Sequence, residues 1–143
     1  MSDIYFDMDG TIVDLYGVEN WLSKLRAHDP SPYVEARPLV NLSRLARYLN
    51  SLQKSGHKIG IISWLSKDPD EMYGLQVLFA KLNWLKKHLP SVNWDYINIV
   101  PYGMAKEKFG SGILFDDESA NRESWGNGAY KETEIFEVLK SLT

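Results

Sequence analysis

The chain has 143 residues, the size of a single domain, and its 16 basic and 19 acidic residues give a formal net charge of −3. That acidic balance is unfavourable for neutralising the phosphates of a nucleic acid, so we expect no nucleic-acid polymer as a partner. The sequence contains no Cys, which excludes disulfides, thiolate metal sites, iron–sulfur clusters and Cys nucleophiles.

Apolar runs and apolar residues at helical spacing alternate along the chain. They predict, in chain order, a strand over 4–6, helices over 18–27 and 38–55, a strand over 58–63, a helix over 69–88, strands over 96–100 and 113–115, and a helix over 132–142. Pro38 suits the first turn of the second helix, and Gly56 suits its end. The apolar side of the helix over 69–88 is expected to consist of Leu75, Leu78, Phe79, Leu82 and Leu85.

Strands that alternate with helices are typical of a parallel sheet with helices on both faces. The predicted strands are apolar throughout, as expected of parallel strands that are buried on both sides. We therefore expect an α/β fold, a three-layer αβα Rossmann-like arrangement, that forms one domain over 1–143. In such sheets, ligands bind outside the carboxyl ends of the strands.

Carboxylates follow two of the predicted strands directly. The strand over 4–6 is followed by Asp7 and Asp9, and the strand over 113–115 is followed by Asp116 and Asp117. Carboxylates gathered at one edge of a sheet repel one another, and a divalent cation relieves that repulsion. Without Cys and without a nearby His, the oxygen ligands favour Mg²⁺, which commonly accompanies phosphate substrates in proteins.

The segment Asp7-Met8-Asp9 has a spacing that suits phosphoryl chemistry. Where the chain turns out of a strand, one carboxylate can attack a phosphorus atom while the other transfers a proton to the leaving oxygen. Gly10 allows the backbone to turn sharply, and the Thr11 hydroxyl can hold the loop.

These motifs resemble a known family in nearly the whole chain and in the family's order. Residues 7–14 (DMDGTIVD) resemble the first motif of the haloacid-dehalogenase-like superfamily, the aspartyl phosphohydrolases. Residues 61–63 (IIS), 104–108 (MAKEK) and 113–118 (ILFDDE) are similar to its second, third and fourth motifs. Residues 116–126 (DDESANRESWG) look most like the 5′-nucleotidase (deoxyribonucleotidase) group within that superfamily.

The resemblance implies a catalytic role for four positions. Asp7 would be the nucleophile that forms an aspartyl-phosphate, and Asp9 would be the general acid and then the general base. Ser63 would hydrogen-bond a phosphoryl oxygen. A lysine would neutralise the charge shared by Asp7 and the phosphoryl group, and the spacing favours Lys106 over Lys108.

The resemblance also implies a Mg²⁺ site formed by Asp7, Asp9, Asp116 and Asp117. Asp9 would contribute its backbone carbonyl. Of the two adjacent acids, we favour Asp117 as the direct ligand and Asp116 as its support.

The substrate is expected to be a phosphorylated small molecule, with a nucleotide as one candidate. Thr11 and Ser63 are candidate contacts for its phosphate. Tyr16, Trp21 and Trp64 lie close to the motifs, where each can either stack on a substrate base or pack in the core or at the rim of the site.

Only the residues between Gly10 and Pro38 are available for a cap, too few for the full helical cap of the nucleotidase group. We therefore expect no cap, or a minimal one-helix cap: a short flap over 14–37 whose helix over 18–27 covers the site as a lid. Such an open site would also admit a macromolecular phosphate, or would need a partner subunit to close it.

Other classes of protein fit the residues less well. A phosphate- or metal-binding domain with weak or no turnover is an alternative, but every catalytic position is filled. A bacterial receiver domain would need its phosphoacceptor Asp at the end of a central strand, where this chain has Ser63 and Val100.

The N-terminal residues lack the basic segment and the long apolar run of a signal peptide. No stretch approaches the roughly 20 apolar residues that span a bilayer. We therefore expect a cytoplasmic protein without a membrane partner, and the sequence leaves its oligomeric state open.

Overall fold

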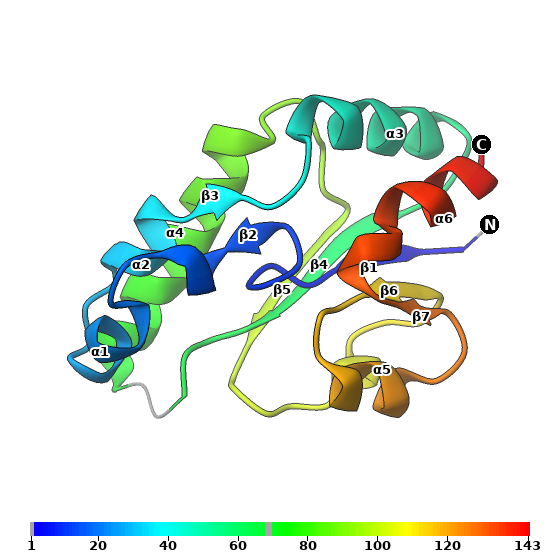
Figure 1. Cartoon of the computed structure of the whole chain (residues 1–143). Coiled ribbons are helices and arrows are strands. Elements are labelled where there is room, and N and C mark those ends of the chain that lie inside the picture. Colours follow the sequence, from blue (N-terminus) through cyan, green and yellow to red (C-terminus); the bar gives the residue numbers. More distant parts are fainter. Residues whose placement is uncertain (1, 68–69) are drawn as a thin grey trace.

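A five-stranded sheet forms the centre of the computed structural model, which describes residues 2–67 and 70–143 (Figure 1). Its strands are β1 (Ile4–Phe6), β4 (Ile59–Trp64), β5 (Tyr96–Val100), β6 (Ile113–Phe115) and β7 (Ala129–Tyr130). They lie in the order β5-β4-β1-β6-β7, and each neighbouring pair is parallel. The predicted parallel α/β sheet is therefore confirmed, and β7 is an additional edge strand that the sequence did not predict.

The register of the sheet brings the motif residues together. β1 lies between β4 and β6, and Phe6 is level with Ile61 and Phe115. Because Asp7 follows Phe6 and Asp116 follows Phe115, the two carboxylates leave neighbouring strands at the same level. The Asp7 amide donates to the Phe115 carbonyl at 2.9 Å, which continues the ladder to the first residue after β1.

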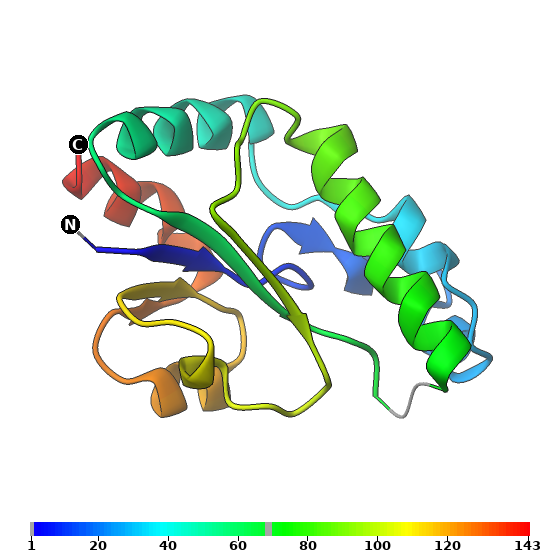
Figure 2. The ribbon, with the colours of Figure 1, turned by 180° about the vertical axis from the view of Figure 1, so that it is seen from behind.

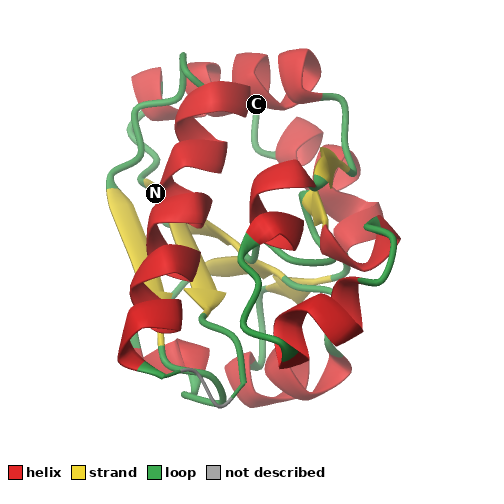
Figure 3. Ribbon diagram, turned by 90° about the vertical axis from the view of Figure 1, so that its left-hand side faces the viewer, coloured by secondary structure: helices red, strands yellow, loops and turns green. Residues whose placement is uncertain are grey.

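Helices pack against both faces of the sheet. Figure 3 shows the strands, in yellow, with helices, in red, packed around them. One face is covered by α3 (Leu42–Lys54), α4 (Glu71–His88) and α6 (Ile135–Ser141). Trp125 of α5 (Ser119–Trp125) and Phe109, after the 3₁₀ helix Lys106–Lys108, pack on the other face. The architecture is Rossmann-like at this level.

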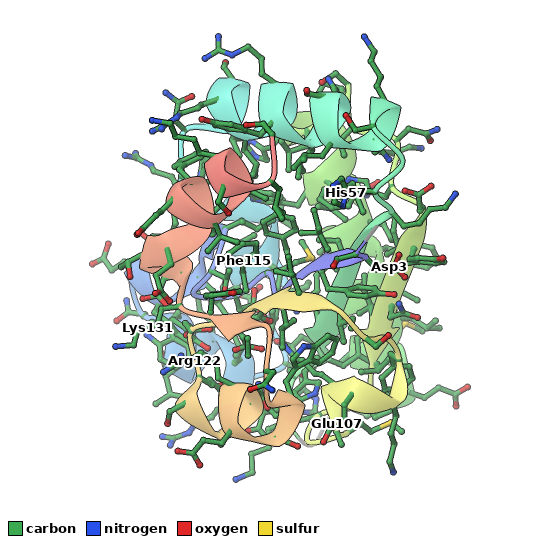
Figure 4. All side chains as sticks on the ribbon, turned by 90° about the vertical axis from the view of Figure 1, so that its right-hand side faces the viewer. Asp3, His57, Glu107, Phe115, Arg122 and Lys131 are labelled. Atoms are coloured by element: carbon green, nitrogen blue, oxygen red, sulfur yellow. The ribbon has the colours of Figure 1, made fainter. Side chains whose placement is uncertain are left out.

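The larger core lies on the α3 side of the sheet. Leu45, Leu49 and Leu52 recur at helical spacing on α3 and pack on apolar side chains of β1 and β6. Phe6 and Phe115 stack with their ring centroids 5.1 Å apart, and Figure 4 shows Phe115 inside the molecule. Each such side chain contributes about 1.5–3 kcal/mol when fully buried, so this layer stabilises the strands that carry the motif residues.

A flap leaves the sheet after the first motif and returns before α3. Two short strands, β2 (Val13–Asp14) and β3 (Arg37–Pro38), pair antiparallel and close it at its base. Between them lie a 3₁₀ helix (Leu15–Gly17), α1 (Trp21–Arg26) and α2 (Ser31–Glu35). Seen from behind, α4 runs beside this flap (Figure 2).

The expectation of one helix over 18–27 in the flap is wrong in extent and number. α1 is shorter, and a second helix, α2, lies beyond the predicted helix, in a part of the flap for which no helix was expected. Pro32 lies in the first turn of α2, where the missing N–H of proline has no partner to lose. The flap therefore holds two short helices.

Two helix starts also differ from the predictions. α3 begins at Leu42, because the Asn41 side chain accepts a hydrogen bond from the Arg44 amide and caps the helix, while Pro38 lies in β3. α4 is described from Glu71, with Asp70 as its cap at 2.7 Å from the Tyr73 amide. Residues 68–69, which were expected to open this helix, lie outside the described residues.

The predicted apolar side of α4 is wrong at Leu75 and Phe79; Leu78 and Leu82 are half-buried, and Leu85 is buried. Leu75 and Phe79 are 45% and 58% exposed. The buried side is formed instead by Tyr73, Val77, Ala80, Lys81, Trp84 and Leu85. This buried side of α4 faces the flap and the sheet, where its aromatic residues and Lys81 have their contacts.

The C-terminal helix is divided into a 3₁₀ turn (Glu132–Glu134) and α6. In the described part of the chain, no helix is both long enough and apolar enough to cross a bilayer.

Candidate functional site

The loop after β1 forms a tight turn. The amides of Thr11, Ile12 and Val13 all lie within hydrogen-bond distance of the Met8 carbonyl, at 2.9–3.0 Å. Gly10 has φ +81°, and a Cβ at this position would overlap the Asp117 carboxylate and come within 2.9 Å of the Tyr16 ring. A glycine is therefore required both by the backbone angle and by the close approach of the fourth motif.

Lys106 connects the first and fourth motifs. Its Nζ donates to Asp7 Oδ1 at 2.9 Å and to Asp116 Oδ2 at 2.6 Å, and its side chain is 2% exposed. Lys108 is exposed, so of the two lysines that the sequence left open, Lys106 is the one in the cluster. Among the described residues, one of the three N–H groups of Lys106 has no hydrogen-bond partner. Since Lys106 lines a cavity, that N–H is available to a ligand.

The two acids of the fourth motif differ in how many donors they meet. Asp116 accepts from Lys106 and from Asn121 on Oδ2 and from the Glu118 amide on Oδ1. Within residues 2–67 and 70–143, the one hydroxyl or N–H donor recorded near the Asp117 carboxylate is that of Thr11, 3.3 Å from Oδ1, and this hydroxyl lies closer to Asp7. Its carboxylate is therefore the one with lone pairs to spare for a cation.

The Thr11 hydroxyl forms hydrogen bonds with both Asp7 and Asp117. Its hydroxyl donates to Asp7 Oδ2 at 3.0 Å and accepts from the Asp117 amide at 3.2 Å. Thr11 is fully buried and does not line the cavity, so the structure places it against the carboxylates and not at a substrate position.

Asp7, Asp116 and Asp117 form a cluster that suits a cation. Each offers a carboxylate oxygen, and the three oxygens lie within 4.8 Å of one another. Burial and, second, the hydrogen bond to Asp7 raise the pKa of Asp117 to about 8. Burial and, second, the charge of Asp7 raise the pKa of Asp116 to about 6. The ionised cluster therefore carries more negative charge than its surroundings compensate.

The donor set fits a hard divalent cation. Asp7 and Asp117 would hold it directly, with Asp116 as their support, and all the available ligands are oxygens. Asp9 lies outside this three-carboxylate cluster, because its side chain is bound elsewhere. The expected contribution of its backbone carbonyl stays a prediction.

Lys81 of α4 is a site residue that the sequence analysis missed. It is 1% exposed, and its Nζ donates to Asp9 Oδ2 at 2.8 Å, to Ser63 Oγ at 2.7 Å and to the Trp64 carbonyl at 2.7 Å. A sequence signal existed: Lys81 interrupts a helical face that is otherwise formed by Tyr73, Val77 and Trp84. The leucines of α4 indicate a different apolar side, and they obscure this signal.

Ser63 lies at the expected strand end but is fully buried beneath the site. Its Oγ accepts from Lys81, so its hydroxyl proton remains available for donation. The other expected residues of the second motif, Ile61 and Ile62, are buried in β4.

A cavity of about 240 Å³ opens between the carboxylates and the flap. Asp7, Asp9 and Lys106 are among the residues that line it. Its aromatic lining consists of Tyr16, Trp21, Tyr33, Trp64 and Tyr102. The expected positions of Tyr16 and Trp64 beside the site are therefore found.

The aromatic residues are held in two pairs. The rings of Tyr16 and Trp21 meet edge to face at 4.8 Å, and those of Trp64 and Tyr102 are 4.9 Å apart. Trp64 is also fixed by a hydrogen bond from Nε1 to the Met104 carbonyl at 2.9 Å. These pairs present fixed apolar surfaces to whatever occupies the cavity.

Comparison of the sequence with protein-family models finds no matching family, and comparison with curated proteins finds no significant match. Two carboxylates two residues apart, Asp7 and Asp9, and the buried Lys106 line an aromatic cavity, and the three-carboxylate cluster adjoins it through Asp7. That combination can attack, protonate and electrostatically stabilise a phosphate ester.

Proposed function

We propose that the protein is a Mg²⁺-dependent phosphomonoester hydrolase of the haloacid-dehalogenase-like superfamily that works through an aspartyl-phosphate. The observation that carries the proposal is the Lys106 bridge between Asp7 and Asp116, beside Asp117. The bridge is buried and faces a cavity, where a negative group on the substrate would complete its coordination.

The first half of the reaction transfers the phosphoryl group to the protein. A carboxylate oxygen of Asp7 attacks the phosphorus, the bond between phosphorus and the leaving oxygen breaks, and Asp9 gives its proton to that oxygen. Burial raises the pKa of Asp9, although the charge of Lys81 acts in the opposite direction, so Asp9 holds a proton more readily than an exposed aspartate does.

The second half returns the protein to its starting state. Water attacks the phosphorus of the aspartyl-phosphate, its proton passes to Asp9, and the bond from phosphorus to Asp7 breaks. Inorganic phosphate and the free Asp7 carboxylate are the products. Asp9 is thus reprotonated and ready for the next substrate.

Positive charge offsets the oxygens that gather in both steps. The free N–H of Lys106 can donate to a phosphoryl oxygen while the other two hold Asp7 and Asp116. A cation bound by Asp7 and Asp117 would neutralise further charge between the nucleophile and the phosphoryl group.

The cavity supports a small substrate with a planar leaving group. Its volume of about 240 Å³ and its aromatic walls suit an aryl or nucleoside group next to the phosphate. The two helices of the flap contribute Trp21 and Tyr33 to these walls, which favours a small molecule over a phosphate on a macromolecule. Within this proposal, a nucleoside monophosphate is the first substrate to try.

The test is hydrolysis of 4-nitrophenyl phosphate with and without Mg²⁺. We expect turnover that needs the cation and is lost in Asp7→Asn, while the matched variant Asp3→Asn keeps it. A panel of nucleoside monophosphates and sugar phosphates then ranks the leaving groups. Absence of Asp7-dependent hydrolysis would refute the proposal.

A further inference from the structure

A second buried lysine, Lys81, lies at the site beside Lys106, and the two are used differently. Lys106 lines the cavity and retains a free N–H, whereas Lys81 is covered and does not line it. An ammonium group has three N–H donors. All three of Lys81 are occupied, by Asp9 Oδ2, Ser63 Oγ and the Trp64 carbonyl. Lys81 therefore has no donor left for a substrate.

The contact with Asp9 distinguishes the two oxygens of that carboxyl group. Oδ2 accepts from Lys81 at 2.8 Å, and within residues 2–67 and 70–143 the structure records no hydrogen bond to Oδ1. Asp9 lines the cavity. A proton on its way to a leaving group has to be carried by the oxygen that is not occupied by the ammonium group, which is Oδ1.

The contact with Ser63 fixes the role of the hydroxyl. Because Oγ accepts from Lys81, the ammonium group turns a lone pair of Oγ toward itself and leaves the O–H to act as a donor. The third contact, with the Trp64 carbonyl, holds Nζ at the end of β4. One atom of α4 thereby links the first motif, the end of β4 and the wall of the cavity.

The setting of Lys81 makes this arrangement specific. Its Nζ lies 5.4 Å from the ring centroid of Tyr33, a cavity residue on the flap. Burying a charge without partners is costly, so an ammonium group with three good acceptors is held at one position.

We propose that Lys81 is a positioning residue for this reaction: it fixes the carboxyl group of Asp9 so that Oδ1 delivers the proton to the leaving oxygen, and it orients the Ser63 hydroxyl as a donor. The inference rests on the proposed hydrolase function. It assigns the role to a residue that touches neither the phosphorus nor the leaving group.

The test compares two substrates that differ in how much they need a proton. 4-Nitrophenolate leaves readily without one, whereas the alcohol of an alkyl phosphate such as glycerol phosphate does not. In Lys81→Met we expect kcat/KM to fall about 10-fold or more on the alkyl phosphate, a part of the roughly 10²–10⁴-fold that general acid catalysis contributes, and much less on the aryl phosphate. Lys87→Met, an exposed lysine on the same helix, should match the wild type on both.

Asp9→Asn identifies the route of the effect. If Lys81 acts through Asp9, the two variants share the same dependence on the leaving group, and Lys81→Met adds little to Asp9→Asn in the double variant. Equal losses on both substrates, or losses that multiply in the double variant, would overturn the inference, because they indicate a general structural role.

Folding is checked by thermal unfolding. If Lys81→Met does not fold, Lys81→Gln takes its place: its polar amide is easier to bury here, but it is shorter, uncharged and has two N–H donors for three acceptors, so the same dependence on the leaving group is expected. Failure of the proposed hydrolase function would give a different result, because the wild type would then be inactive or its activity would survive Asp7→Asn. With Asp7-dependent activity present, a loss in the Lys81 variant that ignores the leaving group contradicts only the role of Lys81.

Discussion

Nζ of Lys106 lies 2.9 Å from Oδ1 of Asp7, a residue 99 positions away in the chain. The register of β1 and β6 makes this approach possible, because it places Asp7 and Asp116 side by side on neighbouring strands. One ammonium group then bridges both carboxylates. The proposed chemistry thus depends on the contact between Lys106 and Asp7, and the register of the sheet positions that contact.

Replacement of Lys106 should abolish most of the activity. In Lys106→Met we expect kcat to fall by about 10²–10³-fold, the range for losing one preorganised donor. Lys108→Met is the matched control, since Lys108 is exposed two residues away in the same 3₁₀ helix. Steady-state kinetics of 4-nitrophenyl phosphate hydrolysis measure both. Equal activity in the two variants would contradict the assignment of Lys106.

Gly10→Ala should disturb the site as well as the fold. Its added methyl group would lie 2.7 Å from the Asp117 carboxyl carbon, in a backbone conformation with φ +81°. Gly103→Ala provides the control, because Gly103 has φ +85° but no atom within 4 Å of the added methyl group.

Strain at positive φ alone costs about 1–2 kcal/mol, so we expect Gly103→Ala to be destabilised by that amount and to stay active. Gly10→Ala should be less stable than Gly103→Ala and should lose activity. Urea unfolding and the phosphatase assay separate the two effects. Similar stability and activity in both variants would show that the space around Gly10 does not matter.

Mg²⁺ should stabilise the protein through the acidic cluster. A ligand that binds only the folded state at about 100 times its Kd adds about 2.7 kcal/mol to the free energy of unfolding. The midpoint of thermal unfolding should therefore rise with Mg²⁺ and return with a chelator. Asp117→Asn should remove the shift, whereas Asp14→Asn, on the flap, should keep it. A shift that survives in Asp117→Asn would place the cation elsewhere.

The metal-free protein should lose stability as the pH rises. The pKa of Asp117 is raised to about 8 and that of Asp116 to about 6, so the folded state binds protons that the unfolded state has released. These two carboxyl groups contribute their full stabilisation to the free energy of unfolding below about pH 4, the usual carboxyl pKa. That stabilisation is lost as the pH rises through their pKa values in the folded state.

Urea unfolding in a chelator at about pH 5 and about pH 8 measures this loss. Saturating Mg²⁺ should reduce it, because the cation favours the ionised carboxylates. Asp117→Asn should also reduce it. Stability that rises over this interval would contradict the pKa values of the cluster.

The sheet and the first and fourth motifs could be predicted because each depends on local patterns. Runs of apolar residues mark β1 and β6, and the acids follow directly, so parallel pairing is enough to bring Asp7 and Asp116 together. The short edge strand β7 has only two residues, too few for any period to show.

The lysine network could not be predicted in the same way. Lys81 depends on which side of α4 faces the sheet, and the leucines of that helix suggested the wrong side. Leu75 and Phe79 remain exposed because the space beneath α4 is taken by the flap and by the ammonium group with its acceptors. Contacts between distant elements decide this orientation, and they leave no periodic signal in one sequence.

The flap shows the same limit. Its antiparallel strands, β2 and β3, have two residues each and form because Val13 and Pro38 meet across the segment that they enclose. A pair this short is specified by tertiary contacts and not by local preference.

Covalent labelling of Asp7 tests the central claim most directly. The protein is mixed with Mg²⁺ and a phosphate ester labelled in its phosphoryl group, quenched in acid during turnover, digested, and analysed by mass spectrometry. The account predicts a phosphoryl group on Asp7, stable in acid and released in base, and none in Asp7→Asn. Turnover without a label on Asp7, or a label that persists in Asp7→Asn, would contradict it.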